Sequence, residues 1–182
     1  MMNKIKGVLY DDGVIVWDIE SAKMLYKNGF YGKYLGVRKA KELEMDKPLQ
    51  LSLIEAVYLF EKNILEVYLG GRKLSYYELR KIASSKILLF EDIYIVYKDL
   101  RDRGYVVKSG MKFGATFAVY EHGPGIDHAP FLVHVLSFED ELDPLEIVRA
   151  GRLSHSVRKK FVIAVVDPIS RKPYYYIFKW FG

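Results

Sequence analysis

The chain has 182 residues, enough for one large domain or two small ones, and 51% of them are hydrophobic. This composition supports a packed core and excludes a disordered chain. Twenty-eight basic and 23 acidic residues give a formal charge of +5, a modest excess that suits a polyanionic partner. The lack of cysteine excludes disulfides and thiolate zinc sites. No apolar run reaches the roughly 18 residues of a membrane span and no secretory pattern opens the chain, so we expect a soluble, cytoplasmic protein.

The first half of the chain predicts a small unit with an antiparallel sheet and helices. Apolar runs at 5–10 and 14–17 flank Asp11-Asp12-Gly13 and predict a β-hairpin. Ser75 and Glu78 form a capping box that opens a helix. The remaining pattern predicts helices over 21–28, 53–63 and 76–83, and a strand over 65–69. The first of these helices is expected to stop at Gly29. We expect this domain to occupy residues 1–87.

The second half predicts a mixed sheet with helices. A helix over 90–103 carries an apolar face and ends at Gly104. Asp143-Pro144 is a typical helix start. The remaining elements are strands over 105–108, 116–121, 131–137, 160–167 and 174–181, and a helix from 143 to about 154. We therefore expect a second α/β domain over 88–182 and an α+β chain as a whole.

Basic side chains gather just before the predicted strand at 160–167. They follow an acidic run and comprise Arg149, Arg152, Arg158, Lys159 and Lys160. Such a group can bind phosphate. The alternative is a solvated helix face followed by charges that protect a strand edge.

Tyr120, His128 and Lys159 each lie beside a predicted strand end and together can cleave RNA without a metal. That reaction uses the neighbouring 2′-hydroxyl as nucleophile and needs a proton acceptor, a proton donor and a positive charge. Histidine, with an ordinary pKa near 6.5, suits the donor, and lysine suits the charge. Tyrosine, with an ordinary pKa near 10, needs a nearby cation to act as the acceptor.

Other residues compete for these roles, because the chain has 15 tyrosines and four histidines. Tyr120 stands out since it ends a strand beside a Gly-Pro-Gly turn. His128 lies at a junction between turn and strand. His134 falls inside a strand and is typical of a packed residue, whereas His122 and His155 remain rivals of His128.

Three segments in this order resemble the catalytic domain of the archaeal and eukaryotic tRNA-splicing endonucleases. They are K-F-G-A-T-F-A-V-Y, H-A-P-F-L-V-H-V and R-L-S-H-S-V-R-K-K-F-V, and they span most of residues 105–167. The resemblance implies that Tyr120 is the general base, His128 the general acid and Lys159 the group that stabilises the transition state. Lys160 follows Lys159 directly, so the assignment can be off by one residue.

The same resemblance implies a substrate. Members of the family cut precursor tRNA, at a bulge-helix-bulge in archaea, and leave a 2′,3′-cyclic phosphate and a 5′-hydroxyl without a metal or other cofactor. Arg152 occupies the position of an arginine that stacks on a bulged base. Arg171 or Lys172 is the candidate for a second arm of that clamp, and Lys160 for a further RNA contact.

The end of the chain predicts assembly. Residues 174–181 are apolar on both faces, so we expect this strand to be buried in a dimer, as in the family. Homotetrameric relatives insert an acidic loop, which lies between their last two strands, into the opposite dimer. In this chain the corresponding loop, residues 167–173, has one acid and two bases. This difference favours a heterotetramer with a structural subunit, and leaves a homotetramer or homodimer open.

Two other readings remain. A metal-dependent nuclease of the restriction-enzyme type needs a P-D…(D/E)-x-K carboxylate set, which the second half does not show on adjacent strands. A non-catalytic RNA-binding subunit of the same complex should lack one of the three side chains, and this chain has all three.

Overall fold

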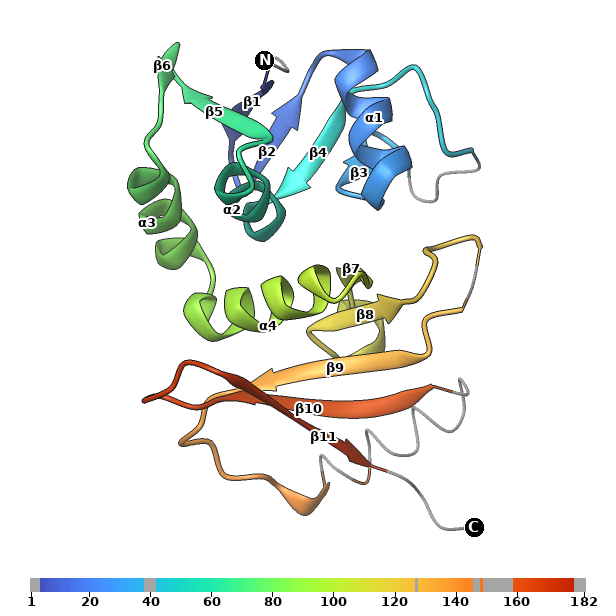
Figure 1. Cartoon of the computed structure of the whole chain (residues 1–182), viewed down its shortest axis with the longest axis vertical. Helices are drawn as coiled ribbons and strands as arrows, with labels where there is room; N and C mark the ends of the chain where they lie inside the picture. Colours follow the sequence, from blue (N-terminus) through green and yellow to red (C-terminus); the bar gives the residue numbers. More distant parts are fainter. Residues whose placement is uncertain (1–3, 38–41, 127, 146–147, 149–158, 179–182) are drawn as a thin grey trace. The chain divides into compact units, whose positions relative to one another are not determined.

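The computed structural model describes residues 4–37, 42–126, 128–145, 148 and 159–178. The chain divides into two compact units, Met1–Leu88 and Leu89–Gly182. Each unit combines a sheet with helices, which confirms the expected α+β class (Figure 1). No helix among the described residues is long and apolar enough to span a membrane.

The first unit builds a six-stranded sheet in the order β3-β4-β2-β1-β5-β6. The predicted hairpin is confirmed, with Tyr10 paired to Gly13. The sheet differs from the expected antiparallel one in a single pair, because β1 and β5 run parallel and are joined by a long crossover that contains two helices. Its elements are β1 (Ile5–Tyr10), β2 (Gly13–Val16), α1 (Ile19–Gly29), β3 (Lys33–Tyr34), β4 (Leu49–Ser52), α2 (Leu53–Glu61), β5 (Leu65–Leu69), β6 (Arg72–Lys73) and α3 (Tyr76–Lys86).

Side-chain caps set the starts of helices in this unit. The capping box of Ser75 and Glu78 opens α3, as predicted. Helix α1 begins two residues before the expected start, because the Asp18 carboxylate accepts a hydrogen bond from the backbone of its first turn. The residue that leaves the helix in the left-handed region is Phe30, at φ 52°, so the prediction that Gly29 has this role was wrong.

The second unit is a five-stranded mixed sheet in the order β11-β10-β9-β8-β7. Among the described strands of this sheet, β9 and β10 pair in parallel and the other neighbours are antiparallel. Most of the helix predicted from Asp143 lies outside the described residues, although the Asp143 carboxylate accepts a hydrogen bond from the Leu145 amide at 2.8 Å. The described elements are α4 (Phe90–Asp102), β7 (Val106–Ser109), the 3₁₀ turn η1 (Met111–Phe113), β8 (Phe117–Tyr120), β9 (Phe131–Leu136), β10 (Lys160–Val166) and β11 (Pro173–Phe178).

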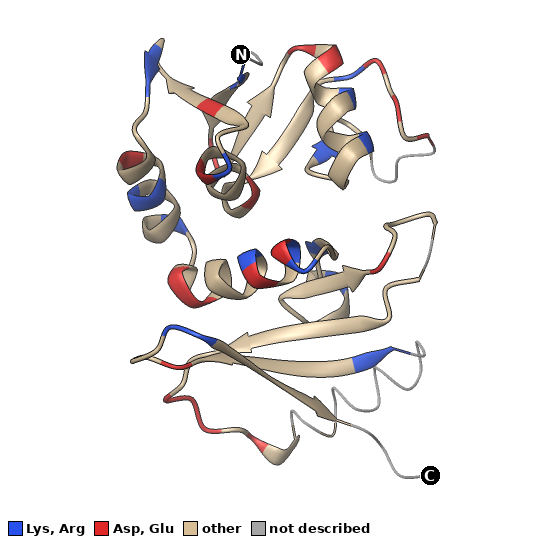
Figure 2. Ribbon diagram, viewed as in Figure 1, with Lys and Arg blue, Asp and Glu red and all other residues tan. Residues whose placement is uncertain are grey.

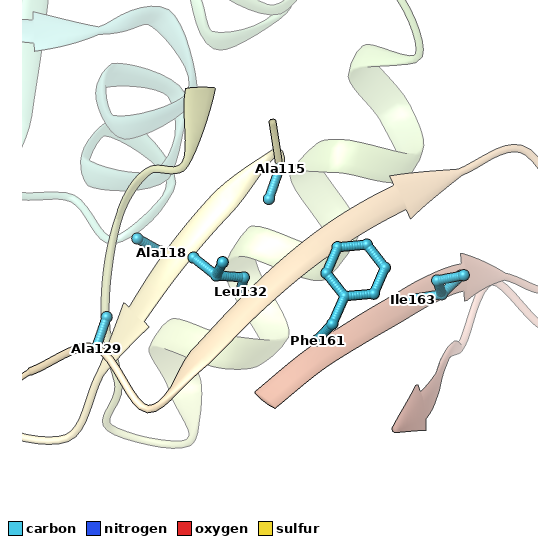
Figure 3. Close-up of a cluster of buried hydrophobic side chains, with 6 residues drawn as sticks. All are labelled: Ala115, Ala118, Ala129, Leu132, Phe161 and Ile163. Carbon is cyan, nitrogen blue, oxygen red and sulfur yellow. The ribbon is translucent and has the colours of Figure 1, made fainter. Parts of the chain in front are cut away.

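The two faces of this sheet have different neighbours. Helix α4 packs on one face, where Tyr97 meets Phe117 with ring centroids 5.8 Å apart. The residue after Phe117 faces the other way, as alternation in a strand requires. A second apolar cluster therefore lies on the face away from α4, shown in Figure 3: Ala115, Ala118, Ala129, Leu132, Phe161 and Ile163.

Polar contacts attach the edge strand β11 to α4. The Tyr175 hydroxyl donates to the Asp99 carboxylate at 2.6 Å, and Arg103 pairs with the same carboxylate at 2.8 Å. At the turn before β11, Arg171 pairs with Asp92 at 3.4 Å. Helix and edge strand are thus joined at two points along α4.

The free energy of unfolding should depend on pH through the phenol of Tyr175. Burial, and then the Asp99 carboxylate, raise the pKa of this phenol above its ordinary value of 10.0. The folded state therefore favours the protonated form, so the stabilisation is complete below pH 10 and declines as the pH rises above it. We expect Tyr175→Phe to lower the free energy of unfolding by about 1–2 kcal/mol at pH 7, and this difference to shrink above about pH 10. Denaturant unfolding of both proteins between pH 7 and 11 measures it.

Tyr77→Phe is the control, because Tyr77 is 72% exposed on α3 and lies outside β11. It should behave like the wild type at each pH. A Tyr175→Phe difference that stays constant through pH 11 would contradict the prediction.

Candidate active site

Tyr120 and Lys159 lie on either side of the segment that leads into β9. In the sheet, Phe131 at the start of β9 pairs with Val119 of β8 and with Lys160 of β10. The next residue of β8 is Tyr120, and the residue before Lys160 is Lys159. Because neighbouring strands are about 4.8 Å apart, the two backbones are separated by roughly 10 Å across β9.

Both side chains border the apolar cluster on the face away from α4. Tyr120 is partly buried and packs against the cluster. The Lys159 ammonium donates a hydrogen bond to the Ala129 carbonyl at 2.7 Å and lies 5.6 Å from the Phe113 ring centroid. Ala129 belongs to the cluster and Phe113 packs against it. The structure therefore brings Tyr120 and Lys159 to the same end of one sheet face.

His128 is next in sequence to a residue of this region. It is exposed, and it directly precedes Ala129, the residue whose carbonyl holds the Lys159 ammonium. Tyr120 thus ends β8, Lys159 directly precedes β10, and His128 lies three residues before β9. This arrangement can provide a proton acceptor, a proton donor and a fixed positive charge around one phosphate.

Lys160 faces the other side of the sheet from Lys159. Its ammonium lies 5.5 Å from the ring centroid of Phe131, which contacts the Tyr105 ring. Figure 2 shows the basic residues at the start of β10. Lys159 and Lys160 are therefore on opposite faces of the sheet, and Lys159 is the one on the face of Tyr120.

Of the predicted base-clamp residues, Arg171 is described and is not brought to this region. Arg171 lies beyond the far end of β10 from Lys159, in the turn before β11, where it pairs with Asp92 of α4. Its backbone is left-handed, at φ 54°. Arg152 lies outside the described residues.

The rival histidines have different surroundings. His122 is exposed in the turn after β8. His134 lies within β9, as expected, with its Nδ1 3.4 Å from the Thr116 hydroxyl oxygen. His155 lies outside the described residues. Among the described residues, no three His, Asp or Glu side chains gather as potential metal ligands.

A tight turn supports Phe113, which the sequence reading did not single out. Three backbone hydrogen bonds close the turn around Gly110, to Thr116, Phe113 and Ala115, at 2.8–3.2 Å. A Cβ on Gly110 would come within 2.7 Å of the Phe117 backbone, so this position requires glycine. The turn thereby fixes the ring against which the Lys159 ammonium lies.

Comparison with known proteins identifies the family. Residues 5–80 match the model of the tRNA intron endonuclease N-terminal domain, and residues 90–174 match that of its catalytic C-terminal domain. The tRNA-splicing endonuclease of Hyperthermus butylicus is 51% identical over 177 residues, which cover 97% of this chain and 98% of that protein. Those of Sulfolobus acidocaldarius and Saccharolobus solfataricus are 46% and 44% identical, over 97% of this chain and 98% of theirs. The chain belongs to the tRNA intron endonuclease family.

The turn around Gly110 can be tested by substitution. We expect Gly110→Ala to lower the free energy of unfolding by about 1–3 kcal/mol, because the added methyl group would press on the Phe117 backbone. Gly114→Asn is a matched control in the same turn: Gly114 has φ +67°, which asparagine tolerates, and open space around it. Denaturant unfolding measures both. Equal stability of the two variants would show that the turn is not closely packed at Gly110.

Proposed function

We propose that this chain is a catalytic endoribonuclease that cuts precursor tRNA at intron boundaries within a bulge-helix-bulge. Its family membership over nearly the full length supports the substrate and the reaction class. One observation carries the assignment of the site. The Lys159 ammonium is hydrogen bonded to the carbonyl of the residue after His128, and Tyr120 borders the same apolar cluster.

In the proposed reaction the protein supplies two proton transfers and one charge. Tyr120 accepts the proton of the 2′-hydroxyl as its oxygen forms a bond to phosphorus. His128 donates a proton to the 5′-oxygen as the P–O5′ bond breaks. Lys159 stabilises the additional negative charge on the phosphorane. The products are a 2′,3′-cyclic phosphate and a 5′-hydroxyl, and no metal takes part in these steps.

Lys159 has a second role in this scheme. A phenol is a useful proton acceptor only when a nearby cation favours the phenolate. Lys159 lies across β9 from Tyr120 and on the same face. We infer that its charge serves both the phenolate and the phosphate, so that a substitution of Lys159 impairs two steps at once.

Residues outside the three would hold the RNA. We propose that Arg152 stacks on an unstacked bulge base and that Lys160, exposed at the start of β10, contacts the RNA backbone. Arg171 is separated from Lys159 by the length of β10 and pairs with Asp92, so we propose that it contacts RNA away from the scissile bond.

We also propose that the chain acts in an assembly, through a dimer formed by β11. This strand is at the sheet edge, and Tyr174, Tyr176 and Ile177 are 51%, 57% and 53% exposed. A largely apolar groove continues the exposed surface on the α4 face, lined in part by Leu100, Tyr105, Phe131, Val133, Tyr175 and Ile177. Burial of this surface by a second chain would remove a large apolar patch from water.

The turn between β10 and β11 favours a heterotetramer with a structural subunit. Its single acid, Asp167, accepts hydrogen bonds from the backbone amides of Ile169 and Ser170. These bonds lower the pKa of the Asp167 carboxyl, which is engaged within its own turn. A partner subunit would then supply the acidic loops, with a homotetramer or a homodimer as the other outcomes.

The catalytic assignment predicts a selective loss of cleavage. His128→Ala should lower the single-turnover rate on a bulge-helix-bulge RNA by about 10²–10⁴-fold, because the leaving oxygen loses its acid. His122→Ala is the matched histidine control and should cut at close to the wild-type rate. EDTA should leave wild-type cleavage intact, and the products should end in a cyclic phosphate and a 5′-hydroxyl.

Each alternative has its own outcome in this assay. Loss of cleavage in EDTA would indicate the metal-dependent nuclease. Absence of cutting by the wild type, even with a partner subunit present, would indicate the non-catalytic RNA-binding subunit. A loss for His122→Ala as large as that for His128→Ala would overturn the choice of acid.

The assembly predicts a sensitive surface on β11. Native mass measurements should find the wild-type chain as a dimer, and as four chains when the structural subunit is added. Tyr176→Glu should give monomers, because it places a charge on the buried strand. Tyr77→Glu is the matched control, at a tyrosine 72% exposed on α3, and should leave the dimer intact. A wild-type monomer at micromolar concentration would contradict the interface.

A further inference from the structure

Two lysines share one aromatic ring beside the candidate active site. The Lys159 ammonium lies 5.6 Å from the Phe113 ring centroid, and the Lys112 ammonium lies 4.6 Å from the same centroid. The two nitrogens are therefore no farther apart than the sum of these distances. Lys112 is exposed, whereas Lys159 is partly buried and fixed to the Ala129 carbonyl.

The position of the ring is set by the fold. Phe113 ends η1, and the turn around it is closed by the hydrogen bonds at Gly110. The ring packs against the same apolar cluster as Tyr120. Phe113 therefore occupies a defined place at the border of the site, where its ring face attracts a nearby cation.

Two ammonium groups at this separation repel each other. The negative face of an aromatic ring offsets part of that repulsion. An anion close to both nitrogens would offset more, and a strand of RNA presents phosphates along its length. The pair of lysines on Phe113 has the charge, and Lys112 has the exposure, to bind such a stretch of backbone.

We propose that Lys112 is a second phosphate-binding residue, which binds the RNA backbone next to the scissile phosphate, and that Phe113 is a positioning residue for both lysines. This inference rests on the proposed function, because it takes Lys159 as the residue at the scissile phosphate. It adds to that function a substrate contact from the turn between β7 and β8.

Binding measurements at several salt concentrations test the role of Lys112. The probe is a bulge-helix-bulge RNA with a 2′-deoxy nucleotide at the cut site, which binds but cannot react. Lys112→Ala removes one phosphate contact, so this variant should bind the RNA more weakly than the wild type. The slope of log K against log salt concentration should fall in magnitude by about one unit. Lys112→Arg keeps the charge and should restore the slope. Lys81→Ala, which removes an exposed lysine from α3, should retain the wild-type slope.

The position of Phe113 has a separate readout. Phe113→Leu keeps an apolar side chain against the cluster but removes the ring face, and should weaken binding about two- to fivefold. It should also lower the single-turnover rate at saturating RNA, because Lys159 is less well held. Phe113→Tyr keeps the ring and should restore both quantities, and an unchanged free energy of unfolding for Phe113→Leu excludes a loss of general stability as the cause.

The inference and the proposed function fail in different ways. If the wild type does not cut the cleavable RNA, the proposed function fails, whatever the binding slope. If the wild type cuts and Lys112→Ala binds with the wild-type affinity and slope, Lys112 is a solvated surface residue and the inference is wrong. If the saturated rate of Lys112→Ala falls as far as that of Lys159→Ala, Lys112 acts on the reaction rather than on binding, which also contradicts the inference.

Discussion

The parallel register between β9 and β10 is the constraint on which the site depends. The Lys160 amide donates to the Pro130 carbonyl at 2.8 Å, and this bond sets the level at which Lys159 meets the start of β9. A slip of one residue would turn Lys159 to the α4 face and Lys160 to the face of Tyr120. The hydrophobic alternation of β10, with Phe161 and Ile163 in the cluster, opposes such a slip. Packing of the core therefore selects which lysine lies on the face of Tyr120.

The two faces and the edge of the C-terminal sheet have different surroundings. On one face, α4 covers the sheet and holds β11 through Asp92 and Asp99, which contributes stability. At one end of the other face, Tyr120 and Lys159 border a small apolar cluster. The edge strand β11 exposes Tyr174, Tyr176 and Ile177. The proposed assembly surface and the candidate active site would therefore use different parts of one sheet, the edge strand and the strand ends around Tyr120.

Much of the fold was predictable from local signals. The hairpin at Asp11, the capping box at Ser75 and the strands around Tyr120 carry strong turn, capping or alternation patterns. The two-residue strands β3 and β6 were missed because so short a run shows no period. Strand β4 was missed as well, because it is formed by pairing with β2 and β3 that local pattern does not show.

The residue types of the candidate site could be selected from the sequence, but their geometry could not. The roles proposed for Tyr120, His128 and Lys159 rest on residue type and on their places near strand ends. The choice between neighbouring lysines required the register of two strands far apart in the sequence. The Phe113 ring had no signal of its own, because an aromatic residue before a strand is typical of core packing. Its relation to two cations arises only when η1 and the start of β10 come together.

We propose that Tyr120, His128 and Lys159 surround one scissile phosphate. A crystal structure of the protein with a bulge-helix-bulge RNA that carries a 2′-deoxy nucleotide at the cut site tests it most directly. We expect this phosphate to lie on the sheet face away from α4, within hydrogen-bond distance of Lys159 and His128, with the Tyr120 hydroxyl beside the 2′-position. A phosphate bound on the α4 face, or in contact with Lys160 in place of Lys159, would contradict it.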